Sequence, residues 1–388
     1  MHTSACRLDR RRFVAGAAAL PAACGLPLPA LGAFAAGTDR LRVGIVGCGG
    51  RGTGAALDAL ASDPGVTVVA MADAFGDQIE SSAALLAARA ARGFDCPPER
   101  RYAGPDAWRQ VVESDLDLVI LATPPAFRPL QAAAAVRAGR HVWCETPGAV
   151  DPSGVGVLAE AVAEAATRGL SFASGLARRH DAFTMALVER IHAGTAGRPL
   201  AATVHADLGL PWSKPAQAGW TAADVVLRNW IRHDHLSGGP FVERHVAAID
   251  MALWALGDED PVGVVPGAAG GGVRYLLADG RHVDAALRRR SGATGRVEEF
   301  IRTTTGVRDL RRPASAPNGD RHPLRVAMAD LVGAIRSGGR LDHGPWLRRA
   351  TLAAVAGRTV LRTGTALAWS DLPDTAARPA RPLQSSHS

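Results

Sequence analysis

Apolar runs and helix-forming segments alternate through the first half of the chain. The apolar runs are short and rich in β-branched residues, which is typical of strands buried on both faces of a sheet. Expected strands cover residues 41–46, 66–71, 116–122, 141–144 and 171–174, and expected helices cover 53–61, 79–92, 129–138 and 152–168. This order predicts an α/β fold whose N-terminal part is a doubly wound parallel sheet.

The second half of the chain alternates apolar and polar positions instead, which is typical of strands with one covered face. Expected strands cover 199–206, 263–265, 273–277, 282–287 and 297–303, and expected helices cover 182–193, 241–256 and 325–336. The change of pattern predicts a second domain of a different kind.

A glycine-rich loop joins the first expected strand to the first expected helix. Its sequence, Gly47-Cys48-Gly49-Gly50-Arg51-Gly52, has the G-x-G-x-x-G spacing in the strand-then-helix context that this motif requires. Gly47 permits the tight turn, Gly49 lets the backbone approach a pyrophosphate, and Gly52 lets the helix pack closely on the strand. The loop therefore predicts a Rossmann dinucleotide site, with the phosphates at the helix N-terminus.

Polar residues at other strand ends extend this site. Asp73 ends the second expected strand, 21 residues after Gly52. A carboxylate there can bind the ribose 2′-hydroxyl of NAD and repels the 2′-phosphate of NADP, so we expect NAD(H) rather than NADP(H). Thr123-Pro124 and Glu145-Thr146-Pro147 also follow strands, on the side where such sheets bind ligands. With the glycine loop, they are the candidate cofactor-binding residues.

The N-terminus predicts export. Asp9-Arg10-Arg11-Arg12-Phe13 is a twin-arginine pattern before an apolar stretch, and Ala33-Phe34-Ala35 offers a cleavage site. We expect residues 1–36 to be a Tat signal peptide, the export machinery to be a partner, and the mature protein to be periplasmic or extracytoplasmic. Two alternatives stay open: the apolar stretch could be retained as a membrane anchor, and Cys24 could be lipidated. Because a periplasm supplies no free dinucleotide, we expect the cofactor to be tightly bound.

Composition adds limits. Hydrophobic residues make up 47% and charged residues 21%, which is typical of a globular protein. The formal net charge is +7, of which the first 35 residues carry +3, and both signs alternate along the rest. We therefore expect no nucleic-acid partner. Cys48, Cys96 and Cys144 lack C-x-x-C spacing and predict neither a disulfide framework nor a zinc site.

A series of motifs runs through the chain in a specific order. After the glycine loop come Ala122-Thr123-Pro124-Pro125, Ala138-Gly139-Arg140-His141-Val142, Glu145-Thr146-Pro147, Ser174-Gly175-Leu176-Ala177-Arg178-Arg179-His180-Asp181, Arg228-Asn229-Trp230, Leu236-Ser237-Gly238-Gly239 and Glu243-Arg244-His245-Val246-Ala247-Ala248-Ile249-Asp250. Over roughly residues 40–372 this series resembles the Gfo/Idh/MocA oxidoreductases, in particular a subgroup of exported bacterial members.

The resemblance implies a domain organisation and an activity. Residues 37–175 would form the NAD(P)-binding domain. Residues 176–372 would form an α+β domain with an open, mostly antiparallel sheet and a C-terminal helix that packs back on the first domain, followed by a tail at 373–388. The sheet face would be covered in a homo-oligomer or by a paralogue, since an exposed face of that size is adhesive. The activity would be hydride transfer between a nicotinamide and a sugar, glycoside or cyclitol.

The resemblance also implies a catalytic set that this chain keeps only in part. The family typically has a Lys between the Glu and Pro of the E-x-P motif, and a carboxylate and a His four residues apart on one helix. Here these positions are Thr146, Glu243 and Ala247. Two of the three groups that would handle the substrate proton are therefore absent.

Other side chains are candidates for the missing catalytic roles. His235 follows His233 and Asp234 in an expected loop before the helix that carries Glu243, and either imidazole is a candidate acid or base. Lys214 is the only lysine in the chain and lies in a loop that is expected to overhang the cleft. Glu243, His235 and Lys214 are thus the candidate catalytic residues, with solvated surface positions as the alternative for the last two.

Substrate contacts are expected from Arg178, Arg228 and His245. The alternative for His245 is a histidine packed between helix and sheet, because it lies two helical positions from Glu243 and points about 200° away. His233 and His235 lack a third ligand at a metal-binding spacing, so no metal is expected.

Two functions of different class remain open from the sequence. The intact glycine loop favours dinucleotide binding in either case, whereas the fold and the polar cleft residues favour an exported oxidoreductase with a rearranged acid/base set. Thr146 and Ala247 favour a non-catalytic dinucleotide- or sugar-binding subunit that pairs with an active paralogue. A redox-driven glycosidase is a third possibility, which no residue of the sequence selects.

Overall fold

The structure is a computed structural model that describes residues 40–209, 211–267, 271–288, 296–311 and 322–372. All of them fall in one of the two units into which the contacts divide the chain, Thr38–Ser388. The expected signal peptide at 1–36, including Cys24, and the expected tail at 373–388 lie outside the described residues. No helix in the described ranges has the length and apolar character needed to cross a membrane.

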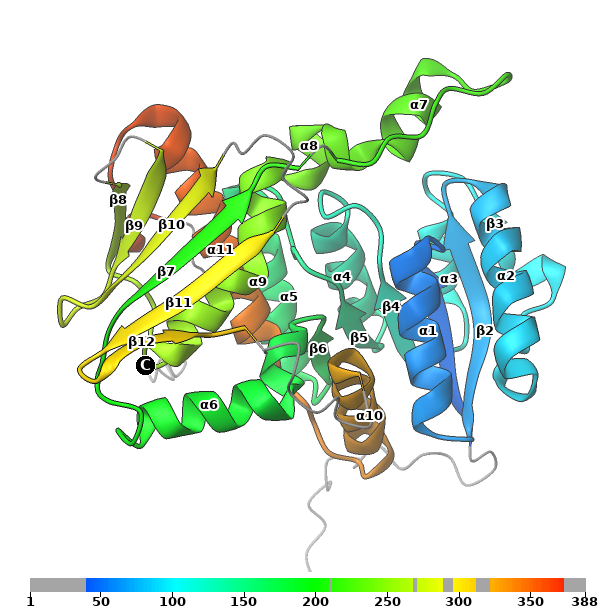
Figure 1. Cartoon of the computed structure of the whole chain (residues 1–388). Coiled ribbons are helices and arrows are strands. Elements are labelled where there is room, and N and C mark those ends of the chain that lie inside the picture. Colours follow the sequence, from blue (N-terminus) through cyan, green and yellow to red (C-terminus); the bar gives the residue numbers. More distant parts are fainter. Residues whose placement is uncertain (1–39, 210, 268–270, 289–295, 312–321, 373–388) are drawn as a thin grey trace, which may run out of the picture. The chain divides into compact units, whose positions relative to one another are not determined.

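Six parallel strands form the first sheet, in the order β3-β2-β1-β4-β5-β6 (Figure 1). Its strands are β1 (Leu41–Val46), β2 (Val66–Asp73), β3 (Arg101–Ala103), β4 (Leu118–Leu121), β5 (His141–Cys144) and β6 (Phe172–Ser174), and its helices are α1 (Gly50–Ser62), α2 (Gly76–Ala90), α3 (Trp108–Glu113), α4 (Arg128–Arg137) and α5 (Pro152–Thr167). The predicted doubly wound parallel sheet is confirmed. The strand order reverses between β1 and β4, which is where such sheets bind dinucleotides.

Side chains of one strand alternate between two apolar layers of this domain. Leu118 and Ile120 of β4 pack into one buried cluster, and Val119 and Leu121 pack into another. All four are fully buried, because helices cover both faces of the sheet. This burial explains why the apolar runs lack regular polar positions.

The second sheet has seven strands in the order β12-β11-β7-β10-β9-β8-β13. They are β7 (Pro199–Asp207), β8 (Gly263–Pro266), β9 (Gly272–Leu276), β10 (His282–Arg288), β11 (Val297–Thr303), β12 (Gly306–Asp309) and β13 (Leu367–Ala368). Every neighbouring pair is antiparallel except β7 and β10. The predicted mostly antiparallel sheet is confirmed.

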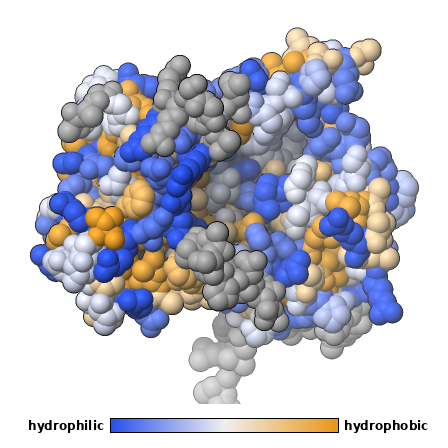
Figure 2. Space-filling model, viewed as in Figure 1, coloured by the Kyte–Doolittle hydropathy of each residue, from blue (hydrophilic) through white to orange (hydrophobic). Residues whose placement is uncertain are grey.

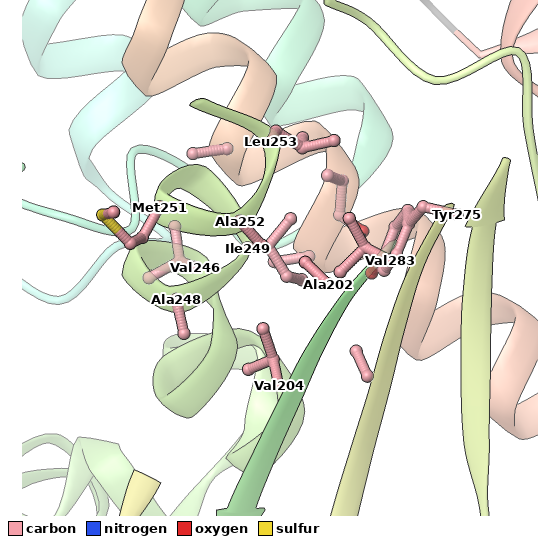
Figure 3. Close-up of a cluster of buried hydrophobic side chains, with 14 of the residues drawn as sticks. Ala202, Val204, Val246, Ala248, Ile249, Met251, Ala252, Leu253, Tyr275 and Val283 are labelled. Carbon is pink, nitrogen blue, oxygen red and sulfur yellow. Dashed lines mark hydrogen bonds between the residues drawn. The ribbon is translucent and has the colours of Figure 1, made fainter. Parts of the chain in front are cut away.

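Two helices cover one face of the second sheet, α9 (Gly239–Ala255) and α11 (Gly344–Thr363). Figure 3 shows Val246 and Ile249 of α9 near Val204 of β7, inside a buried apolar cluster. Tyr275 of β9 donates a hydrogen bond of 2.8 Å to the carbonyl of Ala353 on α11. Helix α11 also packs against α5 of the first domain. The remaining described α-helices are α6 (Ala182–His192), α7 (Ala222–Arg228), α8 (Asp234–Ser237) and α10 (Pro323–Arg336).

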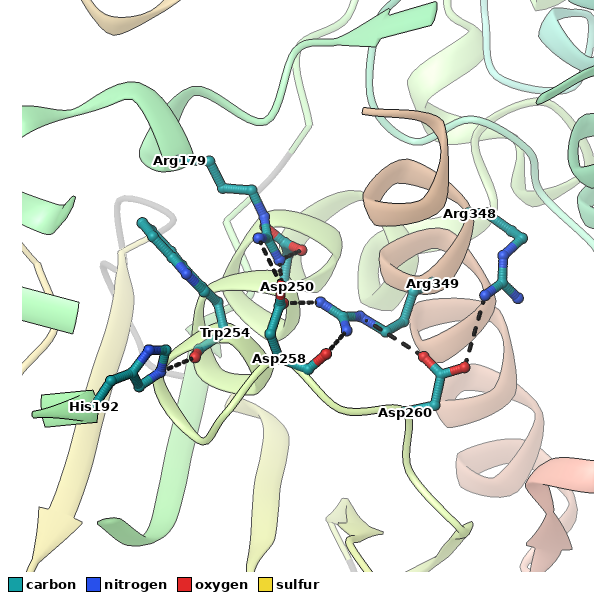
Figure 4. A network of polar contacts seen from close by, with 8 residues as sticks. All are labelled: Arg179, His192, Asp250, Trp254, Asp258, Asp260, Arg348 and Arg349. Carbon is teal, nitrogen blue, oxygen red and sulfur yellow. Dashed lines mark hydrogen bonds and ion pairs between the residues drawn. The ribbon is translucent and has the colours of Figure 1, made fainter. Parts of the chain in front are cut away.

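A buried ionic network fastens the start of the second domain to α9 and α11 (Figure 4). Arg179 donates two hydrogen bonds of 2.8 Å to Asp250 on α9 and reaches Asp258 beyond its end. Arg349 of α11 pairs with the same Asp258. The Arg179 side chain is only 3% exposed, so it holds the fold together rather than facing a ligand.

Short elements are where the structure departs from the sequence prediction. Residues His233–His235 were expected in a loop, but Asp234 begins the one-turn helix α8. Strand β3 and helices α3 and α7 were not predicted. Each has only three to seven residues, which is too few for a periodic pattern to identify.

Candidate functional site

A cavity of about 870 Å³ opens at the carboxyl ends of β1, β2, β4 and β5. Residues of both domains line it, and the face in Figure 2 is hollowed near its centre. Its wall contains the glycine loop, the ends of β2, β4 and β5, the start of α9, and residues of the segment before α8. The cavity size is typical of a small-molecule or cofactor site.

The glycine loop forms one wall, and its glycines have distinct roles. Gly47 has φ +95°, and a Cβ there would lie 2.7 Å from the backbone of Thr123. A Cβ on Gly52 would lie 1.8 Å from the carbonyl oxygen of Gly47, so this residue serves packing and does not line the cavity. A Cβ on Gly49 would meet no protein atom within 4 Å, because Gly49 faces the cavity. This open backbone before the 13-residue helix α1 fits a dinucleotide pyrophosphate.

Asp73 lies in the cavity wall at the end of β2. Its carboxylate accepts hydrogen bonds from the backbone N–H of Cys48 at 2.8 Å and of Phe75 at 3.0 Å. These bonds tie the glycine loop to the end of β2. Burial raises the pKa of Asp73, while the two backbone hydrogen bonds oppose that rise. The carboxylate thus sits where the sequence predicted it.

A buried arginine that the sequence did not single out joins the next two strand ends. Arg128, at the start of α4, is 4% exposed and donates to the carbonyls of Thr123 at 2.7 Å and Glu145 at 3.0 Å, and to that of Pro147. Pro147 itself does not line the cavity, whereas Thr123, Pro124, Glu145 and Thr146 do. No local signal could have identified Arg128, since its partners come from other elements.

Glu145 is the most constrained carboxylate of the site. Its Oε1 accepts hydrogen bonds from the indole N–H of Trp143 at 2.9 Å and from Arg51 at 2.8 Å. Its side chain is 6% exposed, and a Cβ on Gly175 would lie 2.7 Å from its Oε2. Arg51, from the glycine loop, thereby holds a permanent positive charge against Glu145, the residue before Thr146, where the family resemblance implies a lysine.

Glu243 projects from α9 into the same cavity. Its Oε1 is buried and has no hydrogen-bond partner among the described residues. Desolvation raises the pKa of Glu243 to about 7, against the opposing charges of Arg128 and Arg244. A carboxyl group that titrates near neutrality suits proton transfer at physiological pH. Ala247 is exposed, and its methyl group supplies no second acid or base.

Two further predicted residues line the cavity from the second domain. Lys214 lines the wall together with Trp212 and Trp230, and the Asn229 side chain bonds its backbone N–H at 2.7 Å and its carbonyl at 3.0 Å. Arg228 lies beside the end of β2. Three of the eight tryptophans of the chain occur between residues 212 and 230, a clustering that could have marked this wall from the sequence.

Besides Gly52 and Pro147, three more predicted residues lie outside the cavity wall. His245 is fully buried, with Nδ1 at 3.1 Å from the Phe241 carbonyl and Nε2 at 3.2 Å from that of Ala286 on β10. This corrects the expected substrate contact, because a helix places residues 243 and 245 on opposite sides. Arg178 pairs with Glu299 on β11 instead of facing the cavity. His235 is exposed on α8 and does not line it either.

Within the described ranges no group of three or more His, Cys, Asp or Glu side chains is arranged to hold a metal ion. His233 and His235 lie side by side, with ring centroids 5.8 Å apart.

Residues 41–173 match the family described as "Oxidoreductase family, NAD-binding Rossmann fold", GFO_IDH_MocA. Glycosyl hydrolase family 109 protein 1 of Bacteroides fragilis is 32% identical over 114 residues, which is 29% of this chain and 23% of that protein. Inositol 2-dehydrogenase 4 of Saccharopolyspora erythraea is 33% identical over 161 residues, 41% of this chain and 43% of that one. The chain therefore matches less than half of the length of these relatives.

The likeness in fold extends further than the likeness in sequence. The crystal structure of myo-inositol 2-dehydrogenase from Lactobacillus plantarum superimposes with a TM-score of 0.63 at 18% identity, over 85% of this chain and 99% of that one. An oxidoreductase domain protein from Kribbella flavida gives 0.66 at 16% identity, over 85% and 99%. The sequence match to the Gfo/Idh/MocA oxidoreductases thus covers the nucleotide-binding domain, residues 41–173, while the likeness in fold covers both sheets.

Proposed function

We propose that the protein is an NAD-dependent oxidoreductase that transfers hydride between the nicotinamide and a hydroxyl or ketone of a sugar, glycoside or cyclitol. The observation that carries the proposal is Glu243, an unpartnered carboxyl group with a pKa of about 7 in the cavity that the glycine loop also lines. Relatives named inositol 2-dehydrogenase and 1,5-anhydro-D-fructose reductase support the substrate class.

Different residues of the cavity would have different roles in such a reaction. NAD, when bound, supplies the hydride acceptor or donor. As an alcohol loses hydride from its carbon, the Glu243 carboxylate takes the hydroxyl proton, and in the reverse direction the carboxyl group returns it. Arg51 cannot act as a base, because a guanidinium stays protonated, but its charge stabilises oxygen that becomes negative. Arg128 holds the two strand-end loops in position.

We propose NAD(H) rather than NADP(H) as the cofactor. Asp73 places a carboxylate in the cavity wall at the end of β2. A 2′-phosphate near this group would meet like charge.

We also propose that the protein is exported by the Tat route and works outside the cytoplasm. Arg10-Arg11-Arg12-Phe13 supports this proposal. Replacing Arg10 and Arg11 by Lys should leave the precursor in the cytoplasm, and normal export of that variant would contradict the assignment.

A second candidate is a glycosidase that uses the cofactor transiently. Several relatives are named glycosyl hydrolase family 109 proteins, and this match favours it. Oxidation of a sugar hydroxyl acidifies the neighbouring C–H bond, so that the glycosidic oxygen can leave by elimination; water then adds, and the returned hydride restores the alcohol. The net reaction is hydrolysis without net redox change, which suits a cofactor that is never exchanged.

One set of measurements separates these functions. Mass and absorbance spectra of the purified protein identify any retained nucleotide. Single-turnover absorbance at the NADH band over a panel of sugars and cyclitols tests the dehydrogenase, and release of p-nitrophenol from glycosides tests the glycosidase. Bound nucleotide without either activity would favour the non-catalytic subunit, in agreement with Thr146 and Ala247.

A further inference from the structure

A strap from the second domain forms the outer wall of the cavity. It comprises residues 211–232 and contains α7, which stands above the end of β2 and α2 in Figure 1. The strap is closed on itself by the Asn229 side chain, which bonds both backbone groups of Lys214 and the carbonyl of Val225. Helix α7 begins with a capping box between Thr221 and Asp224. The strap is thus an ordered unit rather than a loose loop.

One arginine of this strap makes a closely fitted contact with the first domain. Arg228 donates two hydrogen bonds to the carboxylate of Asp77 on α2, at 2.8 and 2.7 Å. Its guanidinium lies 3.8 Å from the ring centroid of Phe75 and 4.3 Å from that of Trp220. The side chain is 9% exposed. A planar guanidinium between two rings, with a carboxylate at its edge, combines ionic and cation–π contacts.

This contact lies at the nucleotide end of the cavity. Arg228 and Leu227 of the strap share the wall with Asp73, Phe75 and Gln78 of the first domain. Asp73 is the expected ribose-binding residue, and its carboxylate and Arg228 interact electrostatically. A dinucleotide on the glycine loop is therefore enclosed where Arg228 bridges the two domains. For it to leave on this side, the paired hydrogen bonds to Asp77 and the contact with Phe75 have to break together, whereas Trp220 belongs to the strap and moves with Arg228.

We propose that Arg228 is the residue that determines how slowly the nucleotide leaves: stacked on Trp220 of the same strap, it latches the strap over the adenosine end of the cavity through Asp77 and Phe75. This inference rests on the proposed cofactor binding. It assigns Arg228 to cofactor retention rather than to the substrate contact that the sequence suggested. A latched strap also suits a protein that keeps one cofactor through many reaction cycles.

The test is the dissociation rate of NADH from the full chain. The protein is loaded with NADH and mixed with excess NAD⁺ in a stopped-flow instrument, and the nicotinamide fluorescence is followed. Arg228→Lys keeps the charge but loses the paired hydrogen bonds and the planar stack, and Asp77→Asn removes the ion pair from the other side. Each variant should release NADH about 10- to 100-fold faster, with little change in the association rate.

Two controls make the outcome decisive. Arg232→Lys makes the same chemical change at an exposed position of the same strap and should leave the rate unchanged. The double variant Arg228→Lys/Asp77→Asn should release NADH no faster than the faster single variant, because both remove one shared interaction.

Three results would overturn the proposal. Rates within twofold of wild type in both single variants would show that the latch does not limit release, while the proposed oxidoreductase function would stand. An Arg232→Lys variant as fast as Arg228→Lys would show a general loosening of the strap. A wild-type protein that neither retains nor binds NADH would overturn the latch and the proposed function together.

Discussion

The two ends of the cavity are built in different ways. At the nucleotide end, the glycine loop, Asp73 and Asp77 come from a continuous stretch of 31 residues, positioned by one β-α-β unit. At the reaction end, Arg128, Glu145 and Glu243 come from three separate elements that the packing of both domains brings together, and Arg51 of the glycine loop pairs with Glu145. The first end is a local motif, whereas the second exists only in the folded chain. Function read from a motif is therefore secure for cofactor binding and incomplete for catalysis.

The largest expected effect comes from one substitution at the reaction end, which should impair turnover and leave the nucleotide end intact. Glu243→Gln removes the only carboxyl group in the cavity that lacks a hydrogen-bond partner among the described residues. We expect turnover to fall by about 10²- to 10⁴-fold, with NADH affinity nearly unchanged. In wild type, alcohol oxidation should rise with pH through about 7, because the reaction needs the ionised carboxylate. Steady-state rates against pH and a binding titration check both statements.

An unchanged rate in Glu243→Gln would contradict Glu243 as the base and point to Lys214 instead.

The stability of the same variant should also depend on pH differently from that of wild type. Because the folded-state pKa of Glu243 lies above its ordinary value of 4.5, wild type loses stability as pH rises from about 4.5 to 7. The Gln variant should escape this loss, so its melting temperature should exceed that of wild type at pH 8 and the gain should shrink toward pH 4.5.

Within the nucleotide end, substitution of two glycines of the same loop should separate an effect on stability from an effect on NADH affinity. Gly52→Ala puts a Cβ 1.8 Å from a backbone oxygen and should cost about 2–4 kcal/mol of unfolding free energy. Gly49→Ala meets no protein atom and should keep wild-type stability, yet lower NADH affinity about tenfold or more, since its methyl group occupies the space of the pyrophosphate. Urea unfolding and calorimetric titration measure the two effects. Equal NADH affinity in Gly49→Ala and wild type would place the phosphates elsewhere.

Replacing His245 by Ala tests whether this residue has a structural role, as its burial indicates. His245→Ala removes a buried imidazole that lies against the carbonyls of Phe241 and Ala286, one of which accepts the single N–H of the neutral ring, and should cost about 2 kcal/mol of stability. Burial lowers the pKa of His245 to about 4, so wild type loses stability as pH falls from about 6.5 toward 4, and the difference between the proteins should narrow there. NADH binding by the folded variant should be unchanged. A loss of substrate affinity at equal stability would restore His245 as a substrate contact.

The smallest expected effect concerns cofactor choice. Wild type should bind NADH about tenfold more tightly than NADPH, which corresponds to about 1.4 kcal/mol. Asp73→Asn should narrow this preference, because it removes the charge while an amide oxygen can still accept the backbone N–H of Cys48. Titration of wild type and Asp73→Asn with NADH and NADPH measures the preference in each protein. Equal affinities in wild type would mean that the 2′-phosphate lies away from Asp73.

Residue by residue, the sequence predicted the parts of the site that depend on short-range order. The strand 41–46, the glycine loop and Asp73 lie where the spacing placed them, because strand, turn and helix in a β-α-β unit follow each other within a few residues. Glu243 was identified through the family resemblance of its helix motif. The pairing of Arg51 with Glu145 and the three carbonyls held by Arg128 left no trace in the local pattern, since the partners lie 17 to 94 residues apart or on different elements.

The fold class, the two sheets and the cofactor loop were determined by the sequence itself, through apolar periodicity and glycine spacing that act over a few residues. Only the tertiary structure decided which polar groups face the cavity. It buried His245 against β10, directed Arg178 to Glu299, left His235 exposed, and set Arg228 between Phe75 and Trp220. The physical reason is that burial and charge pairing depend on neighbours contributed by distant segments. Those neighbours also desolvate Glu243 and give the site its one carboxyl group that titrates near pH 7.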